Sequence, residues 1–175
     1  MNRVSTKQMF LYNLSNIPTA LNHFLKGSSK LFLGKHICKL DEEYCILTPD
    51  GFRKHLTDDL YITQGFDHNL WGLSNEAFQE IYKKLGHLNV ADPMARLLFR
   101  LILGAATESG LNSRGYLKIP KDLRGYAHIN DEVLLIGQGD YFEIWSPELW
   151  AKQESELTDM GLNTERFSTF EITTR

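Results

Sequence analysis

The chain has 175 residues, of which 42% are hydrophobic and 23% charged, and its formal net charge is −3 at pH 7. This is the composition of a soluble globular protein that is long enough to bury its own core. No apolar run approaches the roughly 18 residues that a membrane-spanning helix needs. The acidic balance disfavours a general polyanion binder, although a local basic patch can still act within an acidic body.

The first 30 residues differ in charge from the rest of the chain. They contain four basic residues and no acidic one, a net charge of +4, whereas the remainder is mildly acidic. The segment has no uninterrupted apolar stretch and no small-residue cleavage pattern, which argues against a secretory signal. We expect residues 1–30 to be a flexible basic N-terminal extension. An amphipathic surface segment and a translated stretch upstream of the true start remain alternatives.

The chain contains an internal repeat. The sequence from 41 to 53 (DEEYCILTPDGFR) aligns with that from 112 to 124 (NSRGYLKIPKDLR) at a constant offset of 71 positions. The paired positions are Leu40 with Leu111, Asp41 with Asn112, Pro49 with Pro120, and Arg53 with Arg124. A unit of about 70 residues that occurs twice predicts two copies of one small module sharing a core.

The first copy consists of short apolar segments separated by turn residues. A strand is expected over 31–40 and a shorter one over 45–48, which Pro49 ends. Residues 60–63 and 69–73 should pair as a hairpin. Together these segments predict a module that is built mainly of strands.

Two helices should follow the first hairpin. Ser74 is a suitable N-cap for an amphipathic helix that ends at Gly86. Asp92 and Pro93 supply the N-cap and the first position of a second helix with a broad apolar face. This second helix, within residues 89–104, is expected to link the two copies.

The second copy repeats the plan of the first. Strands are expected over 105–111 and 116–119, and residues 133–136 and 142–145 should form the hairpin. A third helix should start at Ser146. The expected segments are an extension (1–30), a first repeat (31–88), a linker helix (89–104), a second repeat (105–157) and a polar tail (158–175). This pattern predicts an α+β fold of two pseudo-symmetric halves whose strands form one shared small barrel.

Residues suited to catalysis or metal binding are sparse. Cys38 and Cys45 are the only cysteines, and their spacing is not that of a metal-binding pair, so reduced thiols in a cytosolic protein are expected. The six histidines are scattered. No nucleophile–base set, carboxylate dyad or metal cluster stands out, so we expect no enzyme, no cofactor and no bound metal.

Several segments, in the right order, resemble MraZ proteins over about residues 31–155. They are Leu31 to Gly34, Ile46 to Arg53, the linker helix Arg96 to Ala105, Gly115 to Arg124, and Gly137 to Trp145. The resemblance implies a cytoplasmic, nucleoid-associated regulator of transcription for the bacterial division and cell wall gene cluster. It also implies two AbrB-like swapped-hairpin half-modules with flanking helices, homo-oligomeric rings, promoter DNA as the partner, and neither a membrane nor a small-molecule substrate.

Members of this family contact DNA through a loop motif, D-x-x-x-R, in each copy. The arginine can fork onto a guanine edge or a phosphate, while the aspartate fixes the turn. Here Cys45 stands where the first arginine belongs and Tyr116 where the second belongs, and the first turn carries Glu42 and Glu43, which repel phosphate. Each lost contact would forfeit about 1–3 kcal/mol of base discrimination. A ring-forming scaffold or protein-interaction module that has lost DNA binding is therefore the alternative.

The candidate DNA-contact residues belong to the two turns and the segments beside them. They are Lys35, Lys39, Asp41, Cys45, Asn112, Arg114, Tyr116 and Lys118. Strand alternation is expected to place Lys35 and Lys39 on one face and Ile37 on the other. Solvated surface lysines with no DNA contact remain the alternative. Arg53 and Arg124 hold equal positions in the repeats and should do one structural job, such as pairing with an acid.

Overall fold

The computed structural model describes residues 31–56 and 60–158. The expected N-terminal extension and all but the first residue of the expected polar tail lie outside these residues. The strands are β1 (Lys35–Lys39), β2 (Cys45–Leu47), β3 (Leu60–Gln64), β4 (Leu70–Ser74), β5 (Thr107–Ser109), β6 (Tyr116–Lys118), β7 (Glu132–Gly137) and β8 (Tyr141–Trp145). The helices are α2 (Asp50–Arg53), α3 (Asn75–Gly86), α4 (Pro93–Ile102), α5 (Lys121–Tyr126) and α6 (Pro147–Leu157).

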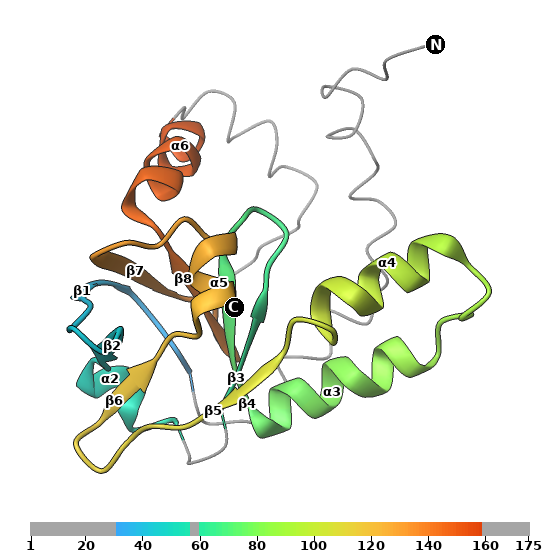
Figure 1. Cartoon of the computed structure of the whole chain (residues 1–175), viewed down its shortest axis with the longest axis horizontal. Helices are drawn as coiled ribbons and strands as arrows, with labels where there is room; N and C mark the ends of the chain where they lie inside the picture. Colours follow the sequence, from blue (N-terminus) through green and yellow to red (C-terminus); the bar gives the residue numbers. More distant parts are fainter. Residues whose placement is uncertain (1–30, 57–59, 159–175) are drawn as a thin grey trace, which may run out of the picture.

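The strands form an antiparallel six-stranded sheet, in the order β1-β7-β8-β4-β3-β5, and a two-stranded sheet of β2 and β6. The two repeats are interleaved in the large sheet. Strand β1 of the first repeat pairs with β7 of the second, and β5 of the second repeat pairs with β3 of the first. Figure 1 shows β2 and β6 with α2 at one end of the molecule, away from the α3–α4 pair. The fold is therefore α+β, and both repeats contribute to each sheet.

The register of the small sheet defines an internal pseudo-twofold axis. Ile46 of β2 lies opposite Leu117 of β6, and these two residues are separated by the repeat offset of 71. The flanking pairs, Cys45 with Lys118 and Leu47 with Tyr116, are exchanged by the same twofold rotation. The repeats thus meet face to face at β2 and β6.

The hydrophobic core lies between the two sheets and draws on both repeats. Phe32, Phe52 and Phe142 meet at its centre, with ring centroids 5.2–5.3 Å apart. Other fully buried members come from both repeats: Ile46, Leu60, Ile62, Leu70, Leu117, Ile119, Leu135 and Ile144. Burial of each such side chain contributes about 1.5–3 kcal/mol to folding. Because both repeats contribute to one core, neither repeat could bury its apolar face alone.

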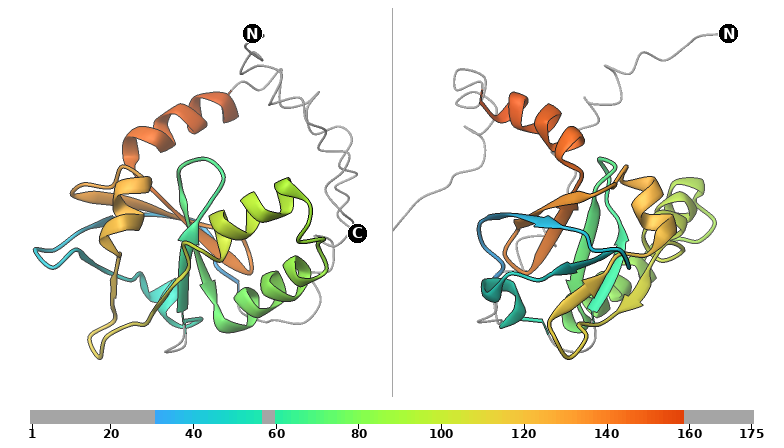
Figure 2. Two further views of the ribbon diagram at one scale, coloured as in Figure 1. Left: turned by 45° about the vertical axis from the view of Figure 1, so that its right-hand side comes forward. Right: turned by 60° about the vertical axis from the view of Figure 1, so that its left-hand side comes forward.

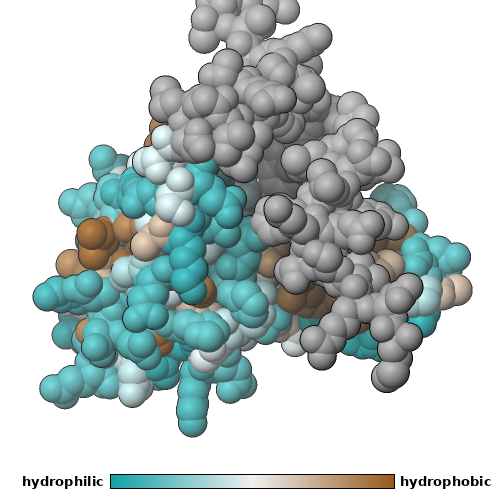
Figure 3. Space-filling model, turned by 90° about the horizontal axis from the view of Figure 1, so that it is seen from above, coloured by the Kyte–Doolittle hydropathy of each residue, from teal (hydrophilic) through white to brown (hydrophobic). Residues whose placement is uncertain are grey.

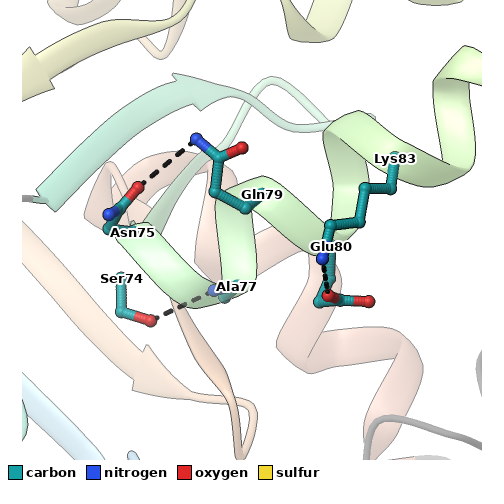
Figure 4. Close-up of polar contacts among 6 residues, drawn as sticks. All are labelled: Ser74, Asn75, Ala77, Gln79, Glu80 and Lys83. Atoms are coloured by element: carbon teal, nitrogen blue, oxygen red, sulfur yellow. Dashed lines mark hydrogen bonds and ion pairs between the residues drawn. The ribbon is translucent and has the colours of Figure 1, made fainter.

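Helix α3 begins and ends as its sequence predicts. The Ser74 hydroxyl accepts a hydrogen bond from the Ala77 amide at 3.2 Å, which satisfies one of the free amides of the first turn. The Gln79–Asn75 hydrogen bond and the Lys83–Glu80 ion pair support the exposed face of the helix (Figure 4). On the other face, the Phe78 ring stacks on Tyr61 of β3 at 4.2 Å.

Helices α3 and α4 run in opposite directions and extend from one side of the sheet (Figures 1 and 2). Asp92 caps α4 by accepting from the Met94 amide at 2.9 Å, and Pro93 follows it at the first position. The Thr63 hydroxyl of β3 donates to the Ile102 carbonyl at the end of α4, which fixes that end of the helix to the sheet.

The element boundaries differ from expectation in several places. The strands expected over 31–40 and 105–111 are shorter, Lys35–Lys39 and Thr107–Ser109, because Gly34 has a positive φ of 86° and the chain around 105 leaves helix α4 through a turn. The short helices α2 and α5 were not predicted. Their N-caps are Pro49 and Pro120, which directly follow the strands expected over 45–48 and 116–119, and the fixed φ of proline suits a helix start as well as a strand end.

The described surface is mostly hydrophilic on the face drawn in Figure 3, and hydrophobic residues occur there as separate patches. Within residues 31–56 and 60–158, none of the helices has the length and apolar character required to span a bilayer.

Candidate nucleic-acid interface

The turn between β1 and β2 is held by one aspartate. The Oδ1 atom of Asp41 accepts hydrogen bonds from the backbone amides of Glu43 at 2.9 Å and Cys45 at 2.8 Å. The Asp41 amide in turn donates to the Cys45 carbonyl at 2.9 Å. The aspartate therefore shapes the turn from inside, as an Asx turn does.

The turn between β5 and β6 has the same construction with an asparagine. The Oδ1 atom of Asn112 accepts from the amides of Arg114 and Tyr116, both at 3.0 Å, and its own amide donates to the Tyr116 carbonyl at 2.9 Å. The replacement of aspartate by asparagine leaves the turn intact because only an acceptor oxygen is required.

The fourth position of each turn adopts the left-handed region. Gly115 has a φ of 80°, which glycine adopts freely, and Tyr44 has a φ of 61°, which costs a residue with a Cβ atom about 1–2 kcal/mol. The Tyr44 ring lies under the guanidinium group of Arg124, whose Cζ is 3.4 Å from the ring centroid. This cation–π contact offsets part of the backbone cost.

Arg53 and Arg124 do one structural job, as their equal positions predicted. Arg53 Nη2 donates to the Thr48 carbonyl and Arg124 Nε to the Ile119 carbonyl, each at 3.1 Å. These two acceptors are themselves 71 positions apart. Arg53 also has the expected acidic partner, because it forms an ion pair with Asp50 at 2.8 Å. The feature common to both arginines is the hydrogen bond to a backbone carbonyl.

An open groove of about 790 Å³ runs beside the first turn, between β1 on one side and β2 with α2 on the other. Four of the candidate residues line it: Lys35, Lys39, Asp41 and Tyr116. The other four, Cys45, Asn112, Arg114 and Lys118, are outside its lining. The structure thus brings Lys35, Lys39 and Asp41 of the first repeat together with Tyr116 of the second.

The prediction for the faces of β1 was wrong. Lys35, Ile37 and Lys39 are all exposed, and Ile37 is the most exposed large apolar residue described, at 72%. Side chains two positions apart point to the same face of a strand, so Ile37 lies between the two lysines on their own face. The inward face of β1 is that of the partly buried His36 and the buried Cys38.

The two lysines of β1 differ in their contacts. Lys35 Nζ forms an ion pair with Glu154 of α6 and lies 4.9 Å from the Trp150 ring centroid. Among the described residues, Lys39 Nζ has Glu132 alone within ion-pair range, at 3.8 Å, and the Lys39 side chain is 83% exposed. Lys39 is therefore the more available donor for an anionic ligand.

The tips of the two turns carry opposite charge. Arg114 and Ser113 are exposed at the tip of the second turn, and Arg114 lies 5.7 Å from the Tyr116 ring centroid. Glu42 and Glu43 are exposed at the tip of the first. The second turn therefore attracts phosphate, and the first repels it.

The residues in place of the motif arginines differ in exposure. Cys45 is only 8% exposed, and burial together with the nearby Asp41 carboxylate raises the pKa of its thiol. Tyr116 is partly exposed and lines the groove. A long side chain can therefore reach solvent from position 116 more easily than from position 45.

The stack between Arg124 and Tyr44 was not predicted from the sequence. The repeat offset pairs Tyr44 with Gly115, so a bulky residue at a position that favours glycine was the available signal. Among the residues that the structure describes, no group of three or more histidine, cysteine or acidic side chains is arranged to hold a metal ion.

The comparison with known proteins agrees with this twofold arrangement. A model of the MraZ protein family, described as antitoxin-like, matches residues 31–101 and again 102–171. The chain is 30% identical to the transcriptional regulator MraZ of Roseiflexus castenholzii over 138 residues, 79% of this chain and 94% of the relative. It is 34% identical to that of Herpetosiphon aurantiacus over 120 residues (69% and 84%), and 31% identical to that of Clostridium acetobutylicum over 138 residues (79% and 97%). The chain therefore belongs to the MraZ family.

Proposed function

We propose that the protein is a sequence-specific DNA-binding transcription regulator of the MraZ type, acting on promoter DNA of the division and cell wall gene cluster, with altered contact loops. The observation that carries the proposal is the pair of equivalent Asx turns, held by Asp41 and Asn112 and related by the pseudo-twofold axis. Loops of fixed shape at a symmetric spacing suit a double helix, whose contacts repeat along its length. The proposed location is the cytoplasm, in association with the nucleoid.

The proposed fold is a pair of AbrB-like swapped-hairpin half-modules, residues 31–88 and 105–157, that share a small barrel. The exchange of β1 and β5 between the repeats supports the swap. Two isolated bridges, Leu40 with Ile46 and Leu111 with Leu117, connect the ends of the large sheet to β2 and β6 and support closure into a barrel. Residues 89–104 are the proposed linker between the half-modules.

The proposed DNA contacts divide between direct contacts and supports. Arg114 at the second tip and Lys39 on β1 supply cations, and Lys118, which is exposed on β6 opposite Cys45, is a further donor. Lys35 is the weakest candidate, because Glu154 already neutralises its charge. Asp41 and Asn112 act through the shape of the turns, and Cys45 and Tyr116 occupy the positions of the family's motif arginines.

Self-association is proposed through the α3–α4 pair. Tyr82, Val90, Met94 and Leu97 are all more than half exposed there, at 55–69%. An apolar surface of this kind on a regulator that reads DNA through repeated loops is best explained by a second copy of the chain. A ring would multiply weak loop contacts and so offset the loss of both motif arginines.

A mobility-shift titration against DNA from the chain's own upstream region, at several salt concentrations, tests the function. Binding should prefer this DNA over a scrambled sequence of equal length. Arg114→Ala and Lys39→Ala should each weaken binding and lower the slope of log affinity against log salt by about one. Lys152→Ala is the matched control, because Lys152 is an exposed lysine on α6, outside both turns and outside the α3–α4 pair. The absence of sequence preference at low salt would refute the proposal.

The alternative is a ring-forming scaffold or protein-interaction module that has lost DNA binding. It is favoured by the carboxylates of Glu42 and Glu43 at the first tip and by the loss of both motif arginines. A pull-down from cells separates the two functions. Recovery of promoter DNA without a stable protein partner would argue against the scaffold, and recovery of a stoichiometric protein partner without DNA would support it.

A further inference from the structure

We infer that Arg124 is a positioning residue that holds the first contact turn from the opposite repeat, so that the two tips present themselves to DNA as one rigid unit. This inference rests on the proposed function for its DNA-binding consequence. Its structural part stands on contacts between Tyr44, Ile119 and Arg124 alone.

Three contacts close a cycle between the repeats. The Ile119 amide donates to the Tyr44 carbonyl at 3.1 Å, and the Ile119 carbonyl accepts from Arg124 Nε at 3.1 Å. The Arg124 guanidinium then lies over the Tyr44 ring with its Cζ 3.4 Å from the centroid. Main chain and side chain of Tyr44 are thus both attached to the second repeat, although the turn belongs to the first.

A second cycle is related to the first by the pseudo-twofold axis. The Thr48 amide donates to the Gly115 carbonyl at 3.1 Å, and the Thr48 carbonyl accepts from Arg53 Nη2. The Arg53 side chain lies directly against Gly115, where an added Cβ atom would come within 2.9 Å of Nε. Each turn is therefore held by the arginine that follows the other repeat's short strand.

The two cycles differ in one respect, and this difference makes the role of Arg124 testable. The guanidinium of Arg124 meets an aromatic ring, whereas that of Arg53 meets a glycine. Removal of the ring from Tyr44 should loosen only the first cycle. The first turn follows Lys39, the cation proposed for the first repeat, and Glu42 and Glu43 at its tip do not themselves attract phosphate. A preorganised site binds with less loss of conformational freedom, so loosening the turn beside Lys39 should also weaken DNA binding.

The test compares Tyr44→Leu with Tyr44→Phe in the full chain. Both variants keep a Cβ atom at the left-handed position, so they differ only in the ring. Hydrogen exchange of the Ile119 amide should be about fivefold faster in Tyr44→Leu and unchanged in Tyr44→Phe. The Thr48 amide, in the second cycle, is the internal control and should be unaffected by either variant.

Nuclear magnetic resonance supplies a signature that general destabilisation would not produce. The Arg124 Nε proton should be shifted upfield by the ring in the wild type and in Tyr44→Phe, and the shift should vanish in Tyr44→Leu. Arg124→Lys keeps the charge but loses the planar group, so exchange of the Ile119 amide in this variant should be as fast as in Tyr44→Leu. An unshifted wild-type resonance, or equal exchange in Tyr44→Leu and Tyr44→Phe, would overturn the inference.

Mobility shifts with the same variants test the DNA-binding part. Affinity should fall about fivefold for Tyr44→Leu and be retained by Tyr44→Phe. If the wild type binds DNA and Tyr44→Leu binds equally well, the inference is wrong while the proposed function stands. If the wild type binds no DNA, the proposed function fails, and the exchange and resonance measurements alone decide whether Arg124 positions the turn.

Discussion

Ile46 and Leu117 lie opposite each other in the β2–β6 ladder, and both are fully buried. They occupy equivalent positions of the two repeats, so the pseudo-twofold axis passes between them. Each repeat contributes one of these side chains to a contact that the other repeat completes. The contact therefore joins the repeats at the base of both turns.

Truncation of either residue should destabilise the whole chain. Ile46→Ala and Leu117→Ala should each lower the free energy of unfolding by about 2–5 kcal/mol, through lost burial and the cavity that remains. The effects in the double variant should not add, because the two side chains share one site. Leu47→Ala is the control, since Leu47 is half exposed on the same strand and should cost little. Equal losses for Ile46→Ala and Leu47→Ala in urea titrations would contradict this account.

The left-handed position in the second turn should accept only glycine. Gly115→Ala adds a Cβ atom at a φ of 80° and at 2.9 Å from Arg53 Nε, so it should lower the free energy of unfolding by about 1–3 kcal/mol. Gly125→Ala is the matched control, because a Cβ atom added there, inside α5, would meet nothing within 4 Å, and alanine favours helix. Thermal unfolding should show opposite shifts for the two variants. A stabilising Gly115→Ala would contradict the prediction.

Much of this arrangement could be predicted from the sequence. The constant offset predicted equivalent turns, and Ser74 and Asp92 predicted the starts of α3 and α4, because a cap is a local signal between neighbouring residues. The short helices α2 and α5 were missed, since four to six residues give no periodic pattern to read. The face of Ile37 was predicted wrongly, because residues two positions apart on a strand share a face and Ile37 is two positions from both Lys35 and Lys39.

The site was less predictable than the fold. The ion pair of Lys35 with Glu154 joins residues 119 positions apart, and the stack of Arg124 on Tyr44 crosses between the repeats. Such contacts depend on the packing of distant elements, which composition and spacing do not encode. The same packing decides that Lys35 is occupied while Lys39 is available.

Lys35 should matter for α6 more than for DNA. Helix α6 has no fully buried residue among those described, and Lys35 attaches it to β1 through Glu154 and the Trp150 ring. The hydrogen bond from Lys35 also lowers the pKa of the Glu154 carboxyl. Lys35→Ala should therefore speed hydrogen exchange along α6 and leave DNA affinity nearly unchanged.

Lys39→Ala is the matched control for Lys35→Ala, because it removes a lysine from the same face of the same strand. It should leave exchange in α6 unchanged and reduce DNA affinity. The reverse result, with α6 insensitive to Lys35→Ala and DNA binding lost, would assign Lys35 to the DNA interface instead.

Glu143 should make stability depend on pH. Burial raises the pKa of its carboxyl above the ordinary value of 4.5, and hydrogen bonds from Trp145 and Gln138 offset this only in part. The Glu143 carboxyl therefore binds its proton more tightly in the folded state than in the unfolded state. The stability that this proton adds is fully present below pH 4.5 and is lost as the pH rises through the folded-state pKa. In Glu143→Gln this dependence should be absent, while the bond from Trp145 can remain. Urea titrations of the wild type and Glu143→Gln should be compared from neutral pH downward. The unfolding free energy of the wild type should rise relative to that of Glu143→Gln as the pH falls. A difference that does not change with pH would refute the role of Glu143.

Restoring a motif arginine should have different effects in the two repeats. Tyr116 is partly exposed at the groove, so Tyr116→Arg should fold normally and bind DNA more tightly, by about 1–3 kcal/mol if the new side chain makes a bidentate contact. Cys45 is only 8% exposed beside the Asp41 carboxylate, so Cys45→Arg must place a longer chain through a packed site and should lower stability. Glu42 and Glu43 would also oppose any phosphate near the first tip.

Mobility shifts and thermal unfolding of both variants, with Tyr116→Gln as the uncharged control, separate effects on DNA affinity from effects on folding. Tighter binding by Tyr116→Gln as well would mean that loss of the tyrosine, and not gain of the guanidinium, changes the interface.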